Sequence, residues 1–300
     1  MDNNDNLEKW VECWKDNSKG MQGLFNENRT AERWNKMSEN YGRDHMGDES
    51  ERHRERTDGI FGFLKDAGFN PEGAKVLDVG CGPGPLSIPL AKAGASVTAV
   101  DIASGMLQRL RQEAEEENLL IDSRELSWWS ADIDELGFRK NFDLVIASMT
   151  PAVNGLESFE KMMACSKNLC YYSNFAGGGR PEEDGFHSLI QSLIQQQPKP
   201  EEENKKMPSH RFHPGNGLYY PFMYLYLSGY RPSVKINSFG HKEGIKWEDA
   251  ALRTIERLSR EHTLDDAAKG KINDYFRNSA KDGICPPKQG MYTGMMVWKV

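Results

Sequence analysis

An acid and three closely spaced glycines stand together in the stretch "VLDVGCGPG", residues 76–84. The apolar residues around Asp78 are typical of a buried strand, and Gly80, Gly82 and Gly84 indicate a tight turn that leads into a helix. Such a turn brings the backbone close to a ligand, because glycine has no Cβ atom, and it presents unpaired amide groups at a helix N-terminus. We therefore interpret this stretch as a ligand-binding loop rather than a plain structural turn.

The spacing of the glycines separates two kinds of ligand. A dinucleotide-binding loop has the pattern G-x-G-x-x-G, whereas here Pro85 occupies the position of the third glycine. Asp78 would also repel a pyrophosphate, and it can attract an ammonium group. The loop therefore favours a ligand with a positively charged amino-acid end over a nicotinamide dinucleotide.

The segments that would position this loop predict an α/β fold. Short strands are expected at 75–80, 96–102, 126–132, 142–149 and 168–175, with helices between them at 84–95 and 104–119. Apolar strands that alternate with helices are typical of a parallel sheet covered on both faces. The core is therefore expected to be α/β.

The flanking segments predict further helices and a closing strand. Trp34, Met37 and Tyr41 share one face of an amphipathic helix, and 57–69 continues as a helix. After residue 180 we expect a helix at 186–197, a solvated loop at 198–208, an aromatic segment at 210–230, a strand or strand pair at 232–245, helices at 246–262 and 264–283, and a strand at 290–300. We predict a single domain, 1–300, with an N-terminal helical cap (1–70), a cofactor-binding core (71–180), and a substrate cover with closing strands (181–300).

Four stretches, "VLDVGCGPG", "VTAVDIASGML", "SADIDEL" and "FDLVIASM", occur in the order in which they resemble class I methyltransferases that use S-adenosylmethionine. The resemblance covers residues 75–175, with a weaker likeness in "RWNKMSENYG". It implies a Rossmann-like, mostly parallel sheet of seven strands whose last strand is antiparallel. The cofactor would lie across the carboxyl ends of the first strands, and S-adenosylhomocysteine would be the product.

The resemblance also implies which residues contact the cofactor. Those that would surround its methionine part are Asp78, Gly80, Cys81 and Gly82. Asp101 would accept hydrogen bonds from both ribose hydroxyls, because a carboxylate offers two acceptor oxygens. The alternative is a helix N-cap role, for which Ser104 is the better candidate.

The adenine ring would be held by residues after the second and third strands. Ile102 and Met106 would pack on it, although either could be ordinary core. Asp132 would accept from the exocyclic amine, with Asp134 as a rival, and the Ile133 amide would reach a ring nitrogen.

The resemblance implies that the segment after the fourth strand lies nearest the transferable methyl group. Ser148 and Met149, together with Thr150, are the candidates there, and "SMTP" departs from the Asn-Pro-Pro-Tyr pattern of nucleobase methylation. Tyr41 would close over the cofactor, unless its helix is only a core helix. Tyr41 and His213 are the candidate catalytic residues, although a surface or loop-anchoring role is the plainer interpretation of His213.

Two further features of the second half were considered as sites. His210 and His213 form H-x-x-H, but no acid or cysteine stands nearby at ligand spacing, and the five scattered cysteines form no C-x-x-C pair, so no metal is expected. Arg180 follows a glycine-rich run and could clamp a substrate carboxylate or phosphate, but a plain connection explains it equally well.

Charge and composition bound the partners. The net charge of −7 and the pI near 5.6 argue against nucleic acid, whose binding depends on clustered Lys and Arg. No apolar run reaches the length of a membrane span, and the first residues are acidic, so we expect a cytoplasmic protein that uses no membrane. The oligomeric state stays open.

These features support one leading hypothesis and three alternatives. The leading hypothesis is methyl transfer from S-adenosylmethionine to a small molecule by in-line displacement. The alternatives are a protein that binds S-adenosylmethionine without catalysis, a nicotinamide-dependent oxidoreductase and a methyltransferase for protein substrates. A general base is needed only if the acceptor carries a proton that it does not shed at neutral pH.

Overall fold

The computed structural model describes residues 3–22, 26–39, 41, 48–177, 189–190, 192–193, 216–239, 244–259, 262–286 and 291–300. Contacts within the chain divide it into two compact units. The first unit comprises Met1–Asn174, Gly217–Ile236 and Gly294–Val300, and the second comprises Phe175–Asn216 and Asn237–Thr293. The expected single domain with parts that meet near residues 70 and 180 stays a prediction.

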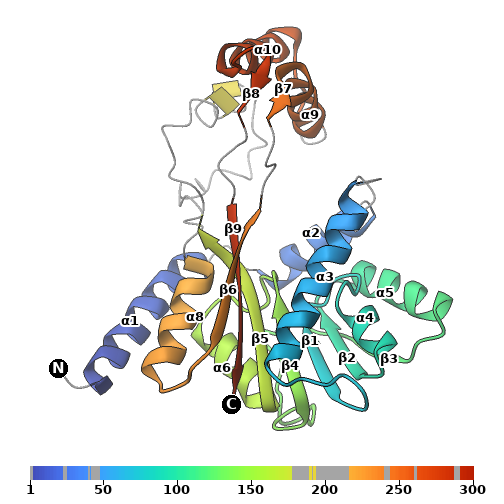
Figure 1. Cartoon of the computed structure of the whole chain (residues 1–300), viewed down its shortest axis with the longest axis vertical. Helices are drawn as coiled ribbons and strands as arrows, with labels where there is room; N and C mark the ends of the chain where they lie inside the picture. The colour runs from blue at the N-terminus through green and yellow to red at the C-terminus, as the bar shows by residue number, and fades with distance from the viewer. Residues whose placement is uncertain are drawn as a thin grey trace. The chain divides into compact units, whose positions relative to one another are not determined.

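A seven-stranded sheet has the order β3-β2-β1-β4-β5-β9-β6 (Figure 1). Its strands are β1 (Lys75–Val79), β2 (Ser96–Asp101), β3 (Ile121–Glu125), β4 (Phe142–Ser148), β5 (Ser166–Gly177), β6 (Ser233–Phe239) and β9 (Met291–Lys299). Strand β1 pairs in parallel with β2 and β4, and the pairs β2–β3 and β4–β5 are also parallel.

Strand β9 runs antiparallel to β5. The Val300 amide donates to the Asn168 carbonyl at 2.9 Å, whereas the Met295 sulfur lies 3.9 Å from the Tyr171 hydroxyl. The later residue of one strand therefore meets the earlier residue of the other. The predicted α/β fold, with seven strands and an antiparallel last strand, is confirmed.

Seven helices are described in the first unit. They are α1 (Asn3–Gln22), α2 (Glu27–Ser38), α3 (Asp48–Asp66), α4 (Ser87–Lys92), α5 (Ser104–Glu116), α6 (Leu156–Cys165) and α8 (Asn216–Leu227). On one face of the sheet, Val76 and Leu144 pack with Leu64 of α3 and Leu110 of α5 in a common buried cluster. Burying each such side chain contributes about 1.5–3 kcal/mol, so these contacts hold the strand ends that carry the predicted site.

The third strand lies earlier than the sequence pattern indicated. The prediction placed it at 126–132, but β3 ends at Glu125, which pairs with Asp101 of β2. The tryptophans after it form a turn in which the Trp128 indole N–H donates to the Ser158 carbonyl at 3.1 Å. The prediction was wrong for two reasons. β3 is a partly exposed edge strand whose residues are mostly polar, and the apolar residues of the turn after it have the sequence pattern of a buried strand.

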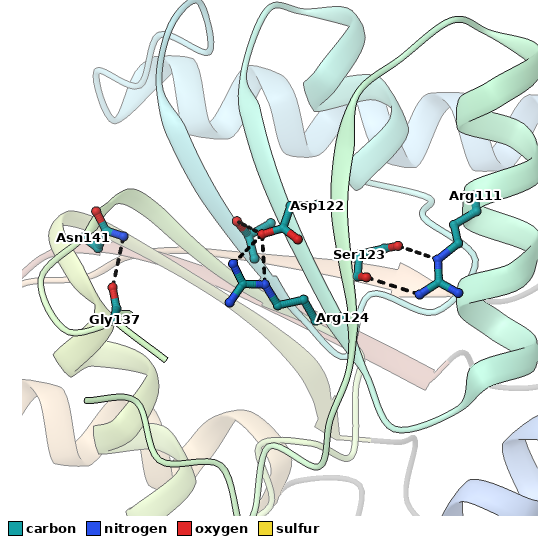
Figure 2. A network of polar contacts seen from close by, with 7 residues as sticks. Arg111, Asp122, Ser123, Arg124, Gly137 and Asn141 are labelled. Atoms are coloured by element: carbon teal, nitrogen blue, oxygen red, sulfur yellow. Dashed lines mark hydrogen bonds and ion pairs between the residues drawn. The ribbon is translucent and has the colours of Figure 1, made fainter. Parts of the chain in front are cut away.

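Polar side chains occupy this sheet edge, as Figure 2 shows. Arg124 forms an ion pair with Asp122 at 2.7 Å, and Arg111 of α5 donates to the Ser123 hydroxyl at 2.7 Å. Charged side chains on an edge strand discourage pairing with a further strand. These polar contacts therefore disfavour the addition of a further strand beside β3, which is the edge strand of the sheet.

The described part of the aromatic segment includes helix α8, which packs on other helices of the first unit. Helix α8 lies beside α1 (Figure 1), and Trp10 contacts Tyr219 with ring centroids 5.2 Å apart. Trp14 contacts Tyr224 at 5.8 Å, and the Tyr224 hydroxyl donates to Glu160 at 2.7 Å. Tyr219 and Tyr224 therefore connect α8 to α1, and Tyr224 also connects it to α6. The sequence alone did not indicate these contacts.

The second unit contains a pair of helices, as expected from the sequence. They are α9 (Trp247–Ser259) and α10 (Asp266–Ser279), and the short strands β7 (Ile245–Lys246) and β8 (Ile284–Cys285) pair antiparallel beside them. The Arg277 guanidinium lies 4.7 Å from the centre of the Trp247 ring. Most of the predicted helix at 186–197, and the whole loop at 198–208, lie outside the described residues.

None of the described helices combines the length and apolar character needed to cross a lipid bilayer.

Candidate active site

A pocket of about 270 Å³ lies in the first unit, where β1, β2 and β4 end. Its walls come from those strand ends, from α2 and α3, and from the turn after β3. The residues predicted to contact the cofactor that line it are Tyr41, Asp78, Gly80, Cys81, Gly82, Asp101, Ile102, Met106, Ser148 and Met149. The topology thus brings together positions that are far apart in the sequence, because the ends of parallel strands meet at one edge of the sheet.

The glycine loop is shaped by close packing at one glycine and by open space at another. A Cβ atom on Gly80 would lie 1.9 Å from the Thr150 hydroxyl oxygen, whereas a Cβ on Gly82 would meet nothing within 4 Å. Both residues have positive φ angles, 66° and 55°. Gly80 therefore lets the loop pack on the segment after β4, and Gly82 leaves the space above the loop free for a ligand.

The amide groups of this loop are already used within the protein. Those of Gly80 and Cys81 donate to the Val100 carbonyl at 2.8 and 3.1 Å, and that of Gly82 donates to the Asp101 carboxylate at 2.8 Å. These three amides are therefore not free donors, and the predicted unpaired donors at the helix N-terminus stay a prediction. The loop contributes a close backbone surface and fixes Asp101.

Asp78 is a buried acid at the floor of the pocket, with 3% of its surface exposed. Its carboxylate accepts a hydrogen bond from the Ser87 hydroxyl at 2.6 Å. Burial, with a smaller contribution from Asp101, raises the pKa of Asp78 to about 6. A cation placed beside this carboxylate would relieve the cost of its ionisation.

Asp101 lies at the end of β2 and is held by two backbone amides. Its carboxylate oxygens accept from Gly82 at 2.8 Å and from Ala103 at 2.9 Å. Burial raises the pKa of Asp101 despite these hydrogen bonds. Ala103, rather than Ser104, occupies the N-cap position of α5.

Helix α2 is fixed over the pocket through α5. The Asn35 side chain accepts from the Gly105 amide at 2.8 Å, which satisfies one of the free donors at the start of α5. Arg109 donates to the carbonyls of Ser38, at 2.9 Å, and of Tyr41. Both contacts anchor the end of α2 that adjoins the pocket.

The aromatic side chains at that end of α2 form one wall of the pocket. Trp34 and Tyr41 both line it, with ring centroids 6.2 Å apart in an edge-to-face arrangement. Tyr41 keeps 41% of its surface exposed. The covering role of Tyr41 stays a prediction, and α2 also packs as an ordinary amphipathic helix.

The residues after β4 adopt an unusual backbone conformation beside the pocket. Met149 has φ of 50°, a region that L-residues rarely occupy, and its amide donates to the Ser173 carbonyl at 2.9 Å. The Ser148 and Ser173 hydroxyls lie 3.0 Å apart. Local strain of this kind is often found at functional sites, where the surrounding contacts maintain it.

Two of the predicted adenine contacts lie elsewhere. Asp132 and Ile133 line a separate hollow of the first unit, beside the ion pair of Asp134 with Arg139. The pocket is lined instead by Leu126, Ser127, Trp128 and Trp129. This difference follows from the earlier end of β3, and the polar alternation in "IDSRE" was the sequence signal for it.

Sequence reasoning also missed Arg56 of α3. It is the one lysine or arginine among the described residues that line the pocket, and it forms no ion pair with another described residue. No motif in the sequence singled it out, because α3 approaches the strand ends only in the folded chain. His210, His213 and Arg180 lie outside the described residues.

The strand order, the antiparallel last strand and the pocket at the ends of β1 and β2 define a class I methyltransferase fold. Residues 76–169 match the family model described as "Methyltransferase domain". This segment of the chain matches a methyltransferase domain, as the sequence motifs predicted.

Parts of the chain are similar to known methyltransferases. The chain is 55% identical over 53 residues to a ubiquinone biosynthesis O-methyltransferase of Actinobacillus pleuropneumoniae, covering 18% of this chain and 23% of that protein. It is 37% identical over 94 residues to a magnesium-protoporphyrin O-methyltransferase of Synechocystis, covering 31% and 39%. The chain thus spans less than half the length of these relatives.

A solved structure resembles a larger part of the chain. The crystal structure of magnesium protoporphyrin IX methyltransferase from Synechocystis with bound S-adenosylhomocysteine covers 71% of this chain and 94% of its own. The two sequences are 18% identical, and the TM-score is 0.49.

Proposed function

We propose that this protein transfers a methyl group from S-adenosylmethionine to a small-molecule acceptor. The observation that carries the proposal is the pocket at the ends of β1 and β2, which is lined by the buried Asp78 and the half-buried Asp101 together with Trp34 and Tyr41. S-Adenosylmethionine carries an ammonium group and a sulfonium, and both positive charges are complementary to these acids.

The amino-acid end of the cofactor fits the charged residues at one part of the pocket. Asp78 would hold the ammonium group, and Arg56 would hold the carboxylate. The Asp78 carboxylate receives only the Ser87 hydroxyl among the described donors, so it keeps acceptor capacity. Arg56 offers a guanidinium without a carboxylate partner among the described residues.

The nucleoside would lie across Asp101 and the turn after β3. Each oxygen of Asp101 already accepts one amide, and each retains a lone pair for one ribose hydroxyl. Ile102 and Met106 supply apolar contacts to the base from one side. We propose that Leu126–Trp129 take the place of Asp132 and Ile133 on the other side.

The reaction itself needs alignment more than acid–base chemistry. A lone pair on the acceptor attacks the methyl carbon while the carbon–sulfur bond breaks, and the bonding pair stays on sulfur to give S-adenosylhomocysteine. The positive charge of the sulfonium is lost in this step. Holding acceptor, methyl and sulfur in line within a pocket that excludes water supplies most of the catalysis.

Residues near the methyl group follow from the end of β4. Ser148, Met149 and Thr150 line the pocket there, and we propose that they border the acceptor. Tyr41 would exclude water from above. His213 stays a proposed base for an acceptor that must lose a proton, and its position lies outside the described residues.

The size of the pocket and the names of the relatives support a small-molecule acceptor. The net charge of −7 and pI near 5.6 weigh against nucleic acid, and a cytoplasmic location is proposed on the same grounds as from the sequence. A turnover assay tests the function: the protein is incubated with S-adenosylmethionine and fractions of a metabolite extract, and S-adenosylhomocysteine is measured. Formation that depends on one fraction supports a methyltransferase, whereas tight binding without turnover in any fraction supports a binding protein without catalysis.

A further inference from the structure

The turn that lines the base end of the pocket is held by one lysine of α6. The Lys161 ammonium donates to the backbone carbonyls of Trp128, Trp129 and Ala131 at 2.9, 3.0 and 2.8 Å. An ammonium group has three donors, so all of them are used on this one turn. The three hydrogen bonds of Lys161 therefore all go to the backbone of residues 128–131.

The same turn is attached to its surroundings at two further points. The Trp128 indole N–H donates to the Ser158 carbonyl of α6 at 3.1 Å, and the Trp128 ring lies 5.8 Å from the Lys161 nitrogen. The Ser127 hydroxyl donates to Glu27 of α2 at 2.6 Å. These contacts join the turn to a helix on each side, but Lys161 contributes the largest share of hydrogen bonds to its backbone.

Three carbonyl groups that point at one ammonium cannot be satisfied by a shorter or apolar side chain. Such carbonyls need a donor when they are removed from water, and hydrogen bonds from a charged group are stronger than neutral ones. Without the lysine, we expect the turn to shift until water reaches these carbonyls. Trp128 and Trp129, which line the pocket, would then move away from the base.

We infer that Lys161 is a positioning residue that holds Leu126–Trp129 in the shape that receives the cofactor's base. This inference rests on the proposed function. Lys161 lines a separate hollow of the first unit and is not among the residues of the cofactor pocket, so it acts through the turn.

The experiment compares binding by calorimetry in Lys161→Met, which keeps chain length but has no donor, and Lys161→Arg, which keeps charge and donors. Lys167→Met is the matched control, because it removes an exposed lysine that is paired with Asp143 at 3.1 Å on the same unit. Two probes are titrated, S-adenosylhomocysteine and adenosine. Adenosine has the base and ribose but no amino-acid end.

We expect Lys161→Met to weaken the binding of both probes by the same factor, at least tenfold. The lost contacts lie at the base end of the pocket, and both probes carry the base. Lys161→Arg keeps the charge and N–H donors but is larger and planar, so it should bind both probes more tightly than Lys161→Met, and Lys167→Met should bind them as the unmodified protein does. Asp78→Asn should show the opposite pattern, with weaker S-adenosylhomocysteine and unchanged adenosine. If Lys161→Met does not fold, Lys161→Gln takes its place with the same expectation.

Unchanged binding of both probes by folded Lys161→Met would overturn the inference. So would a loss confined to S-adenosylhomocysteine, or a loss that Lys161→Arg does not restore. Failure of the unmodified protein to bind S-adenosylhomocysteine would instead contradict the proposed function, so the two failures are distinguishable.

Discussion

Asp78 is buried and Asp101 is half-buried, and both line the pocket, where the negative charge of Asp101 contributes to the raised pKa of Asp78. Burial opposes their ionisation, and the hydrogen bonds from Ser87 and from the Gly82 and Ala103 amides offset only part of this cost, so both pKa values are raised. A folded protein retains such a pair when a cation compensates it in the functional state. The proposed cofactor supplies that cation, and two predictions follow from Asp78 alone.

Asp78→Asn should stabilise the protein without ligand while weakening its binding. The pKa of Asp78 in the folded chain is about 6, above the ordinary value of 3.8. The free energy of unfolding therefore falls as the pH rises from about 3.8 to about 6, because only the unfolded chain ionises in this range, and it stays lower above pH 6. Urea denaturation at pH 7 should give a free energy of unfolding about 1–3 kcal/mol higher for the variant, with Glu115→Gln, an exposed acid of α5, as the control. A lower stability of Asp78→Asn would contradict this account.

The affinity for S-adenosylhomocysteine should depend on pH through the same carboxylate. The ammonium group of the ligand binds the ionised form, so affinity is full above pH 6 and is lost as the pH falls and Asp78 takes up a proton. We expect the dissociation constant to rise about tenfold per pH unit below 6, as measured by calorimetry from pH 7.5 to 5. A constant affinity over this range would exclude Asp78 as the partner of the ammonium group.

At the scale of elements, the pocket depends on contacts between segments that the sequence does not mark. Gly80 packs on Thr150, and Asn35 of α2 accepts from the Gly105 amide at the start of α5. The glycine pattern predicted the loop, because glycine adopts positive φ without the steric cost that other residues carry. The partners of that loop could not be predicted, since they come from the three-dimensional approach of other elements.

Gly80→Ala and Gly82→Ala form a matched pair that isolates the contact with Thr150. Both positions have positive φ, so the backbone strain of the two substitutions should be similar. Only the Gly80 Cβ would meet Thr150, at 1.9 Å from its hydroxyl oxygen. We expect urea denaturation to show a loss of about 2–4 kcal/mol for Gly80→Ala and about 1 kcal/mol for Gly82→Ala. An equal decrease in the free energy of unfolding for the two variants would show that the close packing of Gly80 on Thr150 does not contribute to stability.

Asn35→Ala should weaken the docking of α2 on α5. It removes the acceptor of the Gly105 amide, and loss of such a cap costs about 1 kcal/mol. Because α2 carries Trp34 and is followed by Tyr41, both of which line the pocket, the affinity for S-adenosylhomocysteine should fall about threefold to tenfold. Asn35→Asp keeps the acceptor oxygen and should bind as the unmodified protein does. Equal binding by Asn35→Ala would mean that α2 does not contribute to the site.

The strand boundaries show where sequence patterns succeed and where they fail. Strands β1, β2 and β4 are buried, and their apolar runs were predicted near their observed positions. The edge strand β3 carries Asp122 and Arg124 on its surface and was missed, and this error displaced the expected adenine contacts to Asp132 and Ile133. Burial on both faces gives a strand its clear sequence pattern, so an edge strand is the hardest to locate.

At the scale of the whole molecule, the methyltransferase domain accounts for residues 76–169, and the rest of the chain extends it in two ways. Helices α1 and α8 cover part of the first unit through aromatic contacts, whereas α9 and α10 form the core of a second unit. The fold class and most of the residues that line the pocket could be predicted because they depend on local motifs. No pattern in the sequence links the second half of the chain to a particular acceptor.

Binding of the cofactor product should stabilise the whole first unit. A ligand that binds only the folded state adds about 2.7 kcal/mol at a hundredfold excess over its dissociation constant. Thermal unfolding of the protein should therefore shift upward by several degrees with S-adenosylhomocysteine and not with NAD. A shift with NAD alone would favour the nicotinamide-dependent oxidoreductase.

The most direct measurement is a calorimetric titration of the unmodified protein and of Asp78→Asn with S-adenosylhomocysteine at pH 7.5. The pocket at the ends of β1 and β2 predicts one site per chain in the unmodified protein and at least tenfold weaker binding in the variant. No heat with the unmodified protein, or equal affinity in the two, would contradict the assignment of this pocket to S-adenosylmethionine.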